Sequence, residues 1–268
     1  MLAIVAGRGD LPKMIIKKCQ KNEKPFFLIL LEGENSNSDF ISYPHHVVHI
    51  GHTGKILKIL RDNKATEIVF VGGINKPSMS NMKVDAKGAV LLSKILGAKL
   101  FGDDSVLSTV MNFFEKEGFK FLGADEIIDD LVAKAGVLGE LKPEKDFWQD
   151  IAIGKNAIKI ISELDIGQSL VVQQKQIIGV EAIEGTDALI ERSGNLQFKI
   201  GRKPVLIKMK KIGQNIKADL PSLGVQTIHN LHKANFAGIA VEAGSSLIIN
   251  QKEVIRLANE YGLFLVGI

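Results

Sequence analysis

The sequence predicts an α/β protein of two domains. Short aliphatic runs, typical of strands buried on both faces of a sheet, alternate with segments of helical periodicity along the chain. This alternation is characteristic of α/β folds. It is interrupted over residues 133–145, where Gly136, Gly139 and Pro143 break the pattern. We therefore expect one α/β domain over residues 1–134 and a second over residues 135–268.

Composition and charge narrow the class of protein. With 46% hydrophobic and 24% charged residues, the 268-residue chain has the composition of a folded protein with a substantial core. The 34 Lys and Arg against 30 Asp and Glu give a net charge of +4. The basic residues are not concentrated in one arm, so nucleic-acid binding is not expected, whereas an anionic substrate or a membrane surface suits this balance.

Cysteine content and hydropathy suggest where the protein works. Cys19 is the single cysteine, so the chain has no internal disulfide and no cysteine-based zinc site, and we expect a cytoplasmic protein. The longest aliphatic and aromatic run, residues 26–31, is far shorter than a membrane span. We expect a protein that is soluble or at most peripheral on a membrane.

The first domain begins with the pattern of a strand–helix–strand unit. Residues 2–6 are expected to form a buried strand, residues 13–21 a helix and residues 26–31 a second buried strand. This order predicts a Rossmann-like open parallel sheet. The pattern continues with strands at 67–71 and 119–122 and helices at 55–62, 85–96 and 104–117.

Two glycine-containing strand ends are candidate binding sites in this domain. The first is Gly7-Arg8-Gly9-Asp10-Leu11-Pro12, where a dinucleotide fingerprint would need a third glycine at Pro12. A mononucleotide site and an ordinary turn therefore remain as alternatives for Gly7, Gly9, Asp10 and Leu11. The second strand end, Gly72-Gly73-Ile74-Asn75-Lys76, offers Gly73, Asn75 and Lys76 to a ligand, with a plain loop as the alternative. His45, His46, His49 and His52 fit no metal-binding spacing and are expected to be structural or exposed.

Acidic residues follow three expected strands of the second domain. We expect a helix over 146–164, a hairpin of strands 169–173 and 177–183, and strands at 204–209, 238–241, 247–250 and 263–268. The acids at strand ends are Glu184 with Asp187, then Asp219, then Glu242. If these ends share one sheet edge, they form a pocket that can hold magnesium against a diphosphate. The alternative is that each acid is a separate cap or turn residue.

The segment around Asp219 combines a carboxylate with an expected helix start. Pro221 follows shortly and is favoured at the first position of a helix, whose free N–H groups attract anions. A carboxylate beside an anion site needs a cation or a water molecule between the two, as in hydrolysis of a phosphate ester or anhydride. The alternative is that Asp219 only caps the helix.

Several segments together resemble the LpxI family. They are Gly7-Arg8-Gly9-Asp10-Leu11-Pro12, Leu164-Asp165-Ile166-Gly167-Gln168, Val180-Glu181-Ala182-Ile183-Glu184-Gly185-Thr186-Asp187-Ala188, the run from Asp219 to Ile228, and Gly238-Ile239-Ala240-Val241-Glu242-Ala243-Gly244. The resemblance spans the whole chain and is strongest from about residue 164 onward.

The resemblance implies a function in lipid A synthesis of Gram-negative bacteria. Members of the family hydrolyse UDP-2,3-diacylglucosamine to UMP and 2,3-diacylglucosamine 1-phosphate with Mg²⁺ as cofactor. It implies an N-terminal nucleotide-binding domain and a C-terminal catalytic domain with the substrate cleft between them, and a homodimer. Because the substrate is diacylated, peripheral contact with the inner-membrane surface is also expected.

The resemblance also implies roles for individual residues. The critical aspartate of the family falls on Asp219, while Asp187 and Glu184 are candidates for the magnesium shell. We expect substrate contacts from Gln168, Thr186 and Thr227, and we expect Lys208 or Lys210 to balance phosphate charge. Two other functions remain as alternatives, a nucleotide-sugar transferase and a non-catalytic carrier of a lipid nucleotide.

Overall fold

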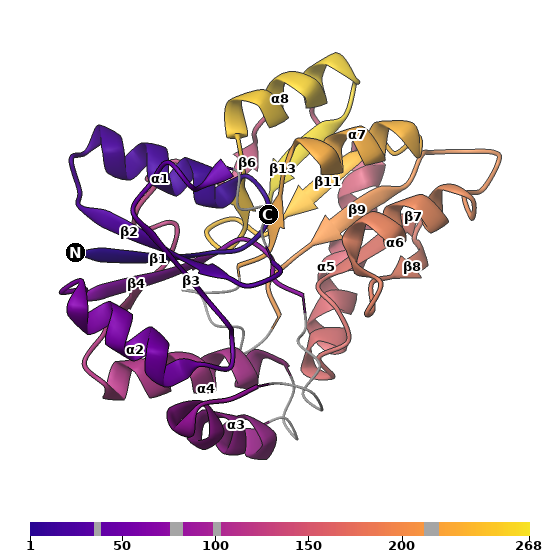
Figure 1. The fold of residues 1–268 in the computed structure, drawn as a ribbon. Helices are drawn as coiled ribbons and strands as arrows, with labels where there is room; N and C mark the ends of the chain where they lie inside the picture. Colours follow the sequence, from indigo (N-terminus) through magenta and orange to yellow (C-terminus); the bar gives the residue numbers. More distant parts are fainter. Residues whose placement is uncertain (35–38, 76–82, 99–102, 212–219) are drawn as a thin grey trace. The chain divides into compact units, whose positions relative to one another are not determined.

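The computed structural model describes residues 1–34, 39–75, 83–98, 103–211 and 220–268. The chain forms two compact units that divide between Asp129 and Asp130, and each has its own sheet and helices (Figure 1). The expected fold class, two α/β domains with a parallel N-terminal sheet, is confirmed. Within the described ranges, no helix combines the length and the apolar character needed to span a bilayer.

The N-terminal unit is built on an open sheet of five parallel strands in the order β3-β2-β1-β4-β5. The chain first extends the sheet on one side of β1 and then returns to the other side, as in a Rossmann-like sheet. The strands are β1 (Leu2–Ala6), β2 (Phe26–Leu31), β3 (His45–Val48), β4 (Glu67–Val71) and β5 (Lys120–Leu122).

Helices cover both faces of this sheet. On one face lies α1 (Leu11–Lys21), whose buried residues include Ile15, Ile16 and Cys19 at helical spacing. Figure 1 shows α2 (Thr53–Asp62), α3 (Ala86–Ala98) and α4 (Asp103–Lys116) on the opposite face. There they enclose a core with β1, β2 and β5 that includes Phe27, Leu60, Phe114 and Phe121.

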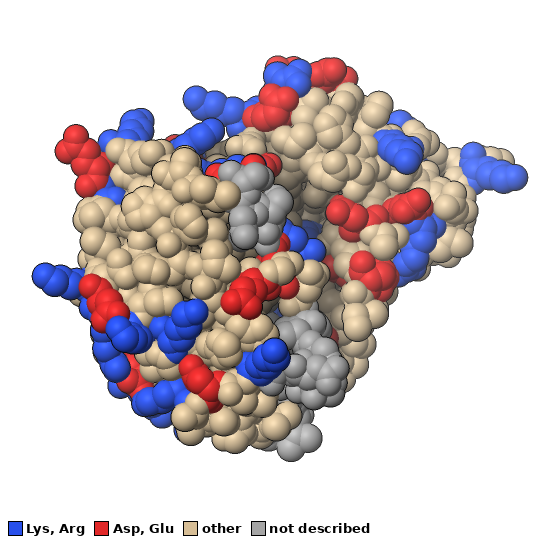
Figure 2. Space-filling view, viewed as in Figure 1, with Lys and Arg blue, Asp and Glu red and all other residues tan. Residues whose placement is uncertain are grey.

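The exposed side of these helices carries charges of both signs. Glu117 pairs with Arg61 at 2.5 Å and with Lys87 at 2.6 Å, and Lys58 pairs with Asp62 one turn along α2. Figure 2 shows the resulting mixture of basic and acidic side chains around α2. Such exposed pairs contribute little to stability.

One carboxylate caps two helices of the N-terminal unit. Asp85 immediately precedes α3 and accepts the Gly88 N–H at 2.7 Å through Oδ1, while its Oδ2 accepts the Lys55 N–H of α2 at 3.1 Å. Both N–H groups lie in first helical turns, where no intrahelical acceptor is available. Burial raises the pKa of Asp85, but hydrogen bonds from the backbone of Gly88, Gly54 and Lys55 outweigh burial and hold that pKa below its usual value.

Replacement of Asp85 by alanine is expected to lower the free energy of unfolding by about 1–2 kcal/mol, as loss of a helix cap does. Because the folded state has the lower pKa, this stabilisation is complete above the unfolded-chain pKa of about 4 and is lost as pH falls through the folded-state pKa. Urea unfolding from pH 7 down to pH 3 should show the wild type and the variant converging. Asp62→Ala, which removes only an exposed partner, serves as the control. A deficit of equal size at every pH would contradict the assignment.

The C-terminal unit is built on a mixed sheet in the order β6-β13-β11-β9-β7-β8. Strands β9, β11 and β13 are parallel, whereas β6, β7 and β8 pair antiparallel with their neighbours. A separate parallel pair joins β10 and β12. The strands are β6 (Gly136–Val137), β7 (Ser169–Gln173), β8 (Gln176–Val180), β9 (Val205–Lys208), β10 (Ser222–Leu223), β11 (Gly238–Val241), β12 (Leu247–Ile248) and β13 (Phe264–Gly267).

Alternate residues of the central strands pack against helices on opposite faces. On one face, α5 (Lys145–Glu163) contributes Ile151 and Ile158 to a core with Leu170 and Ile207. On the other face, α6 (Gly185–Gly194), α7 (Val225–Lys233) and α8 (Gln251–Glu260) share a core with the strands. That second core includes Val171, Leu189, Leu206, Ile228 and Val254.

The expected hairpin is present, and a buried acid holds its turn. Gln174 and Lys175 join β7 to β8 with φ angles of 50° and 68°, as a two-residue type I′ turn requires. The Lys175 N–H donates to Asp150 Oδ1 of α5 at 2.7 Å. Asp150 is fully buried, and its Oδ2 lies 3.4 Å from Arg202 Nη2.

The helix expected to start at Pro221 begins later, so that prediction is wrong. Ser222 and Leu223 form β10, because the backbone around them pairs with β12, including a bond from the Leu247 N–H to Pro221 O at 2.8 Å. The following helix, α7, has Gly224 as its N-cap. Asp219 itself lies outside the described residues, so its expected role stays a prediction.

Candidate functional site

At the carboxyl edge of the N-terminal sheet, the loops after β1 and β4 are hydrogen-bonded to each other. The Arg8 N–H donates to Gly73 O at 2.8 Å, and the Gly73 N–H donates to Arg8 O at 3.1 Å. A Cβ atom on Gly7 would lie 2.5 Å from Gly73 O, so this close backbone approach requires glycine. We call Gly7, Arg8, Gly72 and Gly73 the glycine junction.

Three N–H groups of the glycine junction, those of Gly7, Arg8 and Gly73, donate to backbone carbonyls of the protein. The Gly7 N–H donates to Val71 O at 2.7 Å, and the Gly73 N–H is held by Arg8. The two predicted binding residues Gly7 and Gly73 therefore shape the sheet edge, and their N–H groups are already bonded to backbone carbonyls. An anion at this edge would need other donors.

The start of α1 lies at the same edge and brings the predicted residues Gly9, Asp10 and Leu11 there. Gly9 has φ of +97°, a conformation that favours glycine. Asp10 is the N-cap of α1, but its side chain makes no capping hydrogen bond, and the first turn contains no acid. The N-terminus of an 11-residue helix thus faces the carboxyl edge of the sheet, an arrangement that attracts anions.

Glu34 is a candidate residue that the sequence patterns did not single out. It follows β2, and its side chain is 15% exposed. Its Oε2 accepts the N–H of Asn75, a predicted binding residue, at 2.8 Å and lies 3.9 Å from Arg8 Nε. A carboxylate after the second strand of a Rossmann-like unit is the group that binds ribose hydroxyls in dinucleotide folds. Lys76, also predicted, lies outside the described residues.

A buried polar network occupies the carboxyl edge of β9 in the C-terminal unit. Lys208 Nζ donates to Thr186 Oγ1 at 2.8 Å, and Thr186 Oγ1 donates to Glu181 Oε1 at 3.0 Å. Ser169 Oγ lies 3.4 Å from the same Thr186 oxygen. Lys208 and Glu181 are each 6% exposed, and Ser169 is fully buried. We call Lys208, Thr186, Glu181 and Ser169 the Thr186 network. Thr186 and Lys208 were predicted to bind the substrate, whereas the sequence assigned no role to Glu181 and Ser169.

The two predicted magnesium ligands already have partners in the protein. Glu184 Oε1 pairs with Arg192 at 2.8 Å, and Glu184 Oε2 accepts the Ala182 N–H at 3.1 Å. The hydrogen bond from Arg192 is the main reason that the pKa of Glu184 is lowered. Asp187 is exposed, and its Oδ1 accepts a hydrogen bond from Asn230 at 2.9 Å. Of the two, Asp187 is therefore better suited to contribute a metal ligand.

The described residues do not by themselves form a metal centre. Within them, no group of three or more His, Cys, Asp or Glu side chains is arranged to hold a metal ion. Magnesium often takes only one or two carboxylates and completes its shell with water and substrate phosphates. The exposed carboxylate of Asp187 could be one such magnesium ligand. Asp219 lies outside the described residues.

Two further predicted residues lie at the same sheet edge or beside it. Gln168 precedes β7, its backbone oxygen accepts the Met209 N–H at 2.9 Å, and its Oε1 is buried with no hydrogen-bond partner among the described residues. Thr227 lies one turn before Asn230 on α7, on the side of the helix that contacts Asp187.

Glu242 belongs to a separate contact. It follows β11, and its Oε2 accepts the Lys210 N–H at 2.9 Å. Glu184 and Glu242 follow strands that run in the same direction in this sheet, so both lie at one sheet edge, and each is bonded to different neighbouring groups. The acid that joins the buried network is Glu181.

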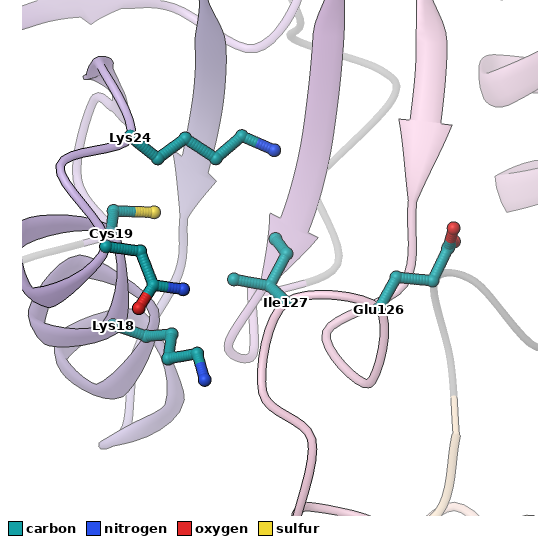
Figure 3. Close-up of a pocket in the computed structure, with 6 residues that line it drawn as sticks. Lys18, Cys19, Lys24, Glu126 and Ile127 are labelled. Atoms are coloured by element: carbon teal, nitrogen blue, oxygen red, sulfur yellow. The ribbon is translucent and has the colours of Figure 1, made fainter.

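A small cavity in the N-terminal unit is lined by none of the residues at the carboxyl edge of its sheet and by none of the Thr186 network. It has a volume of about 160 Å³ and is lined by Lys18, Cys19, Asn22, Lys24, Glu126 and Ile127 (Figure 3). Lys18 pairs with Asp129 and Lys24 with Glu67, each at 2.8 Å. Burial raises the pKa of the Cys19 thiol, which disfavours the nucleophilic thiolate. The cavity offers neither an unpaired cation nor an activated nucleophile among its described lining residues.

Comparisons with known proteins show that the chain is similar to one family along its whole length. Residues 1–131 match the model of the LpxI N-terminal domain, and residues 134–266 match that of the LpxI C-terminal domain. The UDP-2,3-diacylglucosamine pyrophosphatase LpxI of Caulobacter vibrioides is 36% identical to the chain over 272 residues. That alignment covers 100% of this chain and 97% of the Caulobacter protein.

Proposed function

Because the chain belongs to the LpxI family, we propose that it hydrolyses UDP-2,3-diacylglucosamine to UMP and 2,3-diacylglucosamine 1-phosphate, a step of lipid A synthesis. The observation that carries this proposal is the 36% identity to a named UDP-2,3-diacylglucosamine pyrophosphatase over the full length of the chain. The two sheet edges described above supply residue types that suit a nucleotide and a diphosphate.

In this proposal, the N-terminal unit binds the nucleoside. The start of α1, at Gly9, Asp10 and Leu11, offers helix-end N–H groups to an anion, and the glycine junction keeps the adjacent backbone free of side chains. Glu34 accepts hydrogen bonds from the ribose hydroxyls, and its contacts with Asn75 and Arg8 hold the carboxylate in place.

Glu34→Gln is expected to raise KM about tenfold with kcat changed much less, because it weakens a contact that is the same in the bound substrate and in the transition state. Steady-state kinetics of UMP release would measure both constants. Glu32→Gln, a change at an exposed acid in the same turn, is the matched control. An equal loss in kcat with KM unchanged would show that Glu34 acts in the chemical step instead.

The C-terminal unit carries the chemistry in this proposal. Lys208 balances phosphate charge, Gln168 and Thr227 contact the substrate near it, and Thr186 acts on the substrate by holding Lys208. Asp219 orients and deprotonates the attacking water or holds the metal. Asp187, and less favourably Glu184, would help to hold magnesium, which when bound would stabilise charge on the phosphate oxygens.

The substrate also suggests where the protein acts. A diacylated nucleotide sugar resides in a membrane, so we propose peripheral contact with the cytoplasmic surface of the inner membrane. The net charge of +4 suits an anionic surface. We also propose a homodimer on the strength of the family resemblance.

One assay separates the three candidate functions. Purified protein is incubated with UDP-2,3-diacylglucosamine and no acceptor, with added magnesium or with EDTA. UMP release with magnesium and its loss with EDTA are the expected results. Release only after an acceptor is supplied would identify a transferase, and tight binding without turnover would identify a carrier. Unchanged release in EDTA would refute the magnesium requirement.

A further inference from the structure

The hydrogen bonds of the Thr186 network have a defined direction. A threonine hydroxyl has one proton to donate and two lone pairs to accept with. Since an ammonium only donates, Lys208 must donate to Thr186, and Thr186 uses its own proton for Glu181 Oε1. Ser169 Oγ, 3.4 Å away, can then only donate to the second lone pair. Glu181 therefore determines which way the hydroxyl of Thr186 points.

The orientation of Thr186 in turn constrains Lys208. An ammonium group carries three N–H donors, and holding one of them at Thr186 limits the directions of the other two. Lys208 is the last residue of β9 and is 6% exposed, so its side chain is already confined. The result is a chain from a buried carboxylate through a hydroxyl to an ammonium group.

Burial of the Glu181 carboxylate is expected to lower the stability of the fold. Glu181 is 6% exposed, only a neutral hydroxyl donates to its Oε1, and no described residue donates to its Oε2. A buried carboxylate with so few donors loses solvation that its single hydrogen bond does not replace. Among the described residues, no direct contact of this carboxylate gives a stability reason for an acid here.

We propose that Glu181 is a positioning residue. Acting through the hydroxyl of Thr186, its carboxylate fixes the Lys208 ammonium group in the direction needed to meet an anionic oxygen of the substrate diphosphate. This inference rests on the proposed diphosphate hydrolase function. It assigns to Glu181 the role of orienting a cation, with no direct contact to substrate or metal.

Kinetics provide the first test. Glu181→Leu, which removes the acceptor for the Thr186 hydroxyl, is expected to lower kcat at least about tenfold with KM within about twofold, because a misoriented ammonium group mainly weakens binding of the transition state. Thr186→Val should lose as much, while Thr186→Ser, which keeps the hydroxyl, should retain most of the activity. The double variant Glu181→Leu/Thr186→Val should be no slower than Thr186→Val, since Glu181 acts only through that hydroxyl. Additive losses would overturn the proposal, because they would mean that Glu181 acts independently of Thr186.

Stability separates positioning from a structural role. The melting temperature of Glu181→Leu should be within about 3 °C of wild type or higher, because the variant removes a buried carboxylate that has few hydrogen-bond donors. Glu191→Gln, at an exposed acid on α6, is the matched control. A large drop in melting temperature, with kcat falling only in proportion to the folded fraction, would assign Glu181 a structural role instead.

A spectroscopic readout does not depend on the proposed reaction. A fixed, buried ammonium exchanges its protons slowly, so ¹H–¹⁵N NMR of lysine side chains should show a protected Lys208 signal, assigned by its loss in Lys208→Met. The signal should disappear or shift in Glu181→Leu and Thr186→Val and persist in Thr186→Ser and Glu191→Gln. If the wild type releases no UMP, the proposed reaction fails while this signal still decides the positioning role. An absent Lys208 signal in the wild type, or an unchanged one in Glu181→Leu, would overturn the proposal.

Discussion

Replacement of Asp219 by alanine is expected to abolish UMP release, lowering kcat by at least about 10³-fold, the scale of losing a general base or a metal ligand. Asp219 is the aspartate of the segment that resembles the catalytic segment of the LpxI family, and it follows the lysine-containing end of β9 in the sequence. The variant should still fold and bind the lipid nucleotide, which circular dichroism and calorimetric titration with UDP-2,3-diacylglucosamine would measure.

Magnesium dependence distinguishes the two roles considered for Asp219. If Asp219 holds the metal, Asp219→Asn should require a higher magnesium concentration for its residual activity. If Asp219 orients and deprotonates water, the magnesium dependence should be unchanged while kcat falls. Asp129→Asn removes an exposed carboxylate that pairs only with Lys18 in the contacts described here, and it should behave as wild type. Full activity of Asp219→Ala would refute the catalytic assignment.

Replacement of Asp150 by alanine is expected to lower the free energy of unfolding of the C-terminal unit by about 2–4 kcal/mol, because it breaks a buried charge pair and a buried hydrogen bond together. Asp150 is fully buried and holds both the Lys175 N–H in the hairpin turn and the Arg202 guanidinium. Without it, a turn with two residues at positive φ loses its anchor to α5. Urea unfolding followed by circular dichroism would measure the loss.

Two further variants identify the source of that loss. Asp146 pairs with the same Arg202 at 2.8 Å, but its side chain is 53% exposed, so Asp146→Ala should cost less than about 1 kcal/mol. Asp150→Asn keeps an acceptor for the Lys175 N–H and removes only the charge, and it should fall between the two. Equal losses for the Asp146 and Asp150 variants would show that burial of Asp150 contributes nothing.

The order of the main elements was predictable from sequence, because strands buried on both faces appear as aliphatic runs. Residues 2–6 and 26–31 form β1 and β2, within a parallel sheet as expected. Strand β3 was not predicted, since His45 and His46 are polar and half-buried at the sheet edge and Val48 is its only buried residue. The start of α7 was also misplaced, because Ser222 and Leu223 pair with a strand far along the chain, and helix-start preferences describe only neighbouring residues.

The candidate site was predictable to the level of sheet edges. Glycines and acids at strand ends indicated which edges to consider, but neither the partners nor the burial of individual acids follow from spacing. Glu181 and Glu184 are three residues apart, yet the first is buried beneath Thr186 and the second is exposed beside Arg192. Glu34 was missed because its relation to Asn75 exists only after β2 and β4 have joined the same sheet.

The pairing of β6 with β13 has a consequence for synthesis of the chain. Gly136 and Val137 pair with Gly267 and Val266, so the outermost strand on that side of the C-terminal sheet has no partner until residue 267 has been made. The N-terminal sheet, by contrast, has all five strands once residue 122 has emerged. A ribosome-bound chain would therefore carry all strands of the first sheet while the second sheet still has open strand edges, and exposed strand edges make such intermediates prone to aggregation.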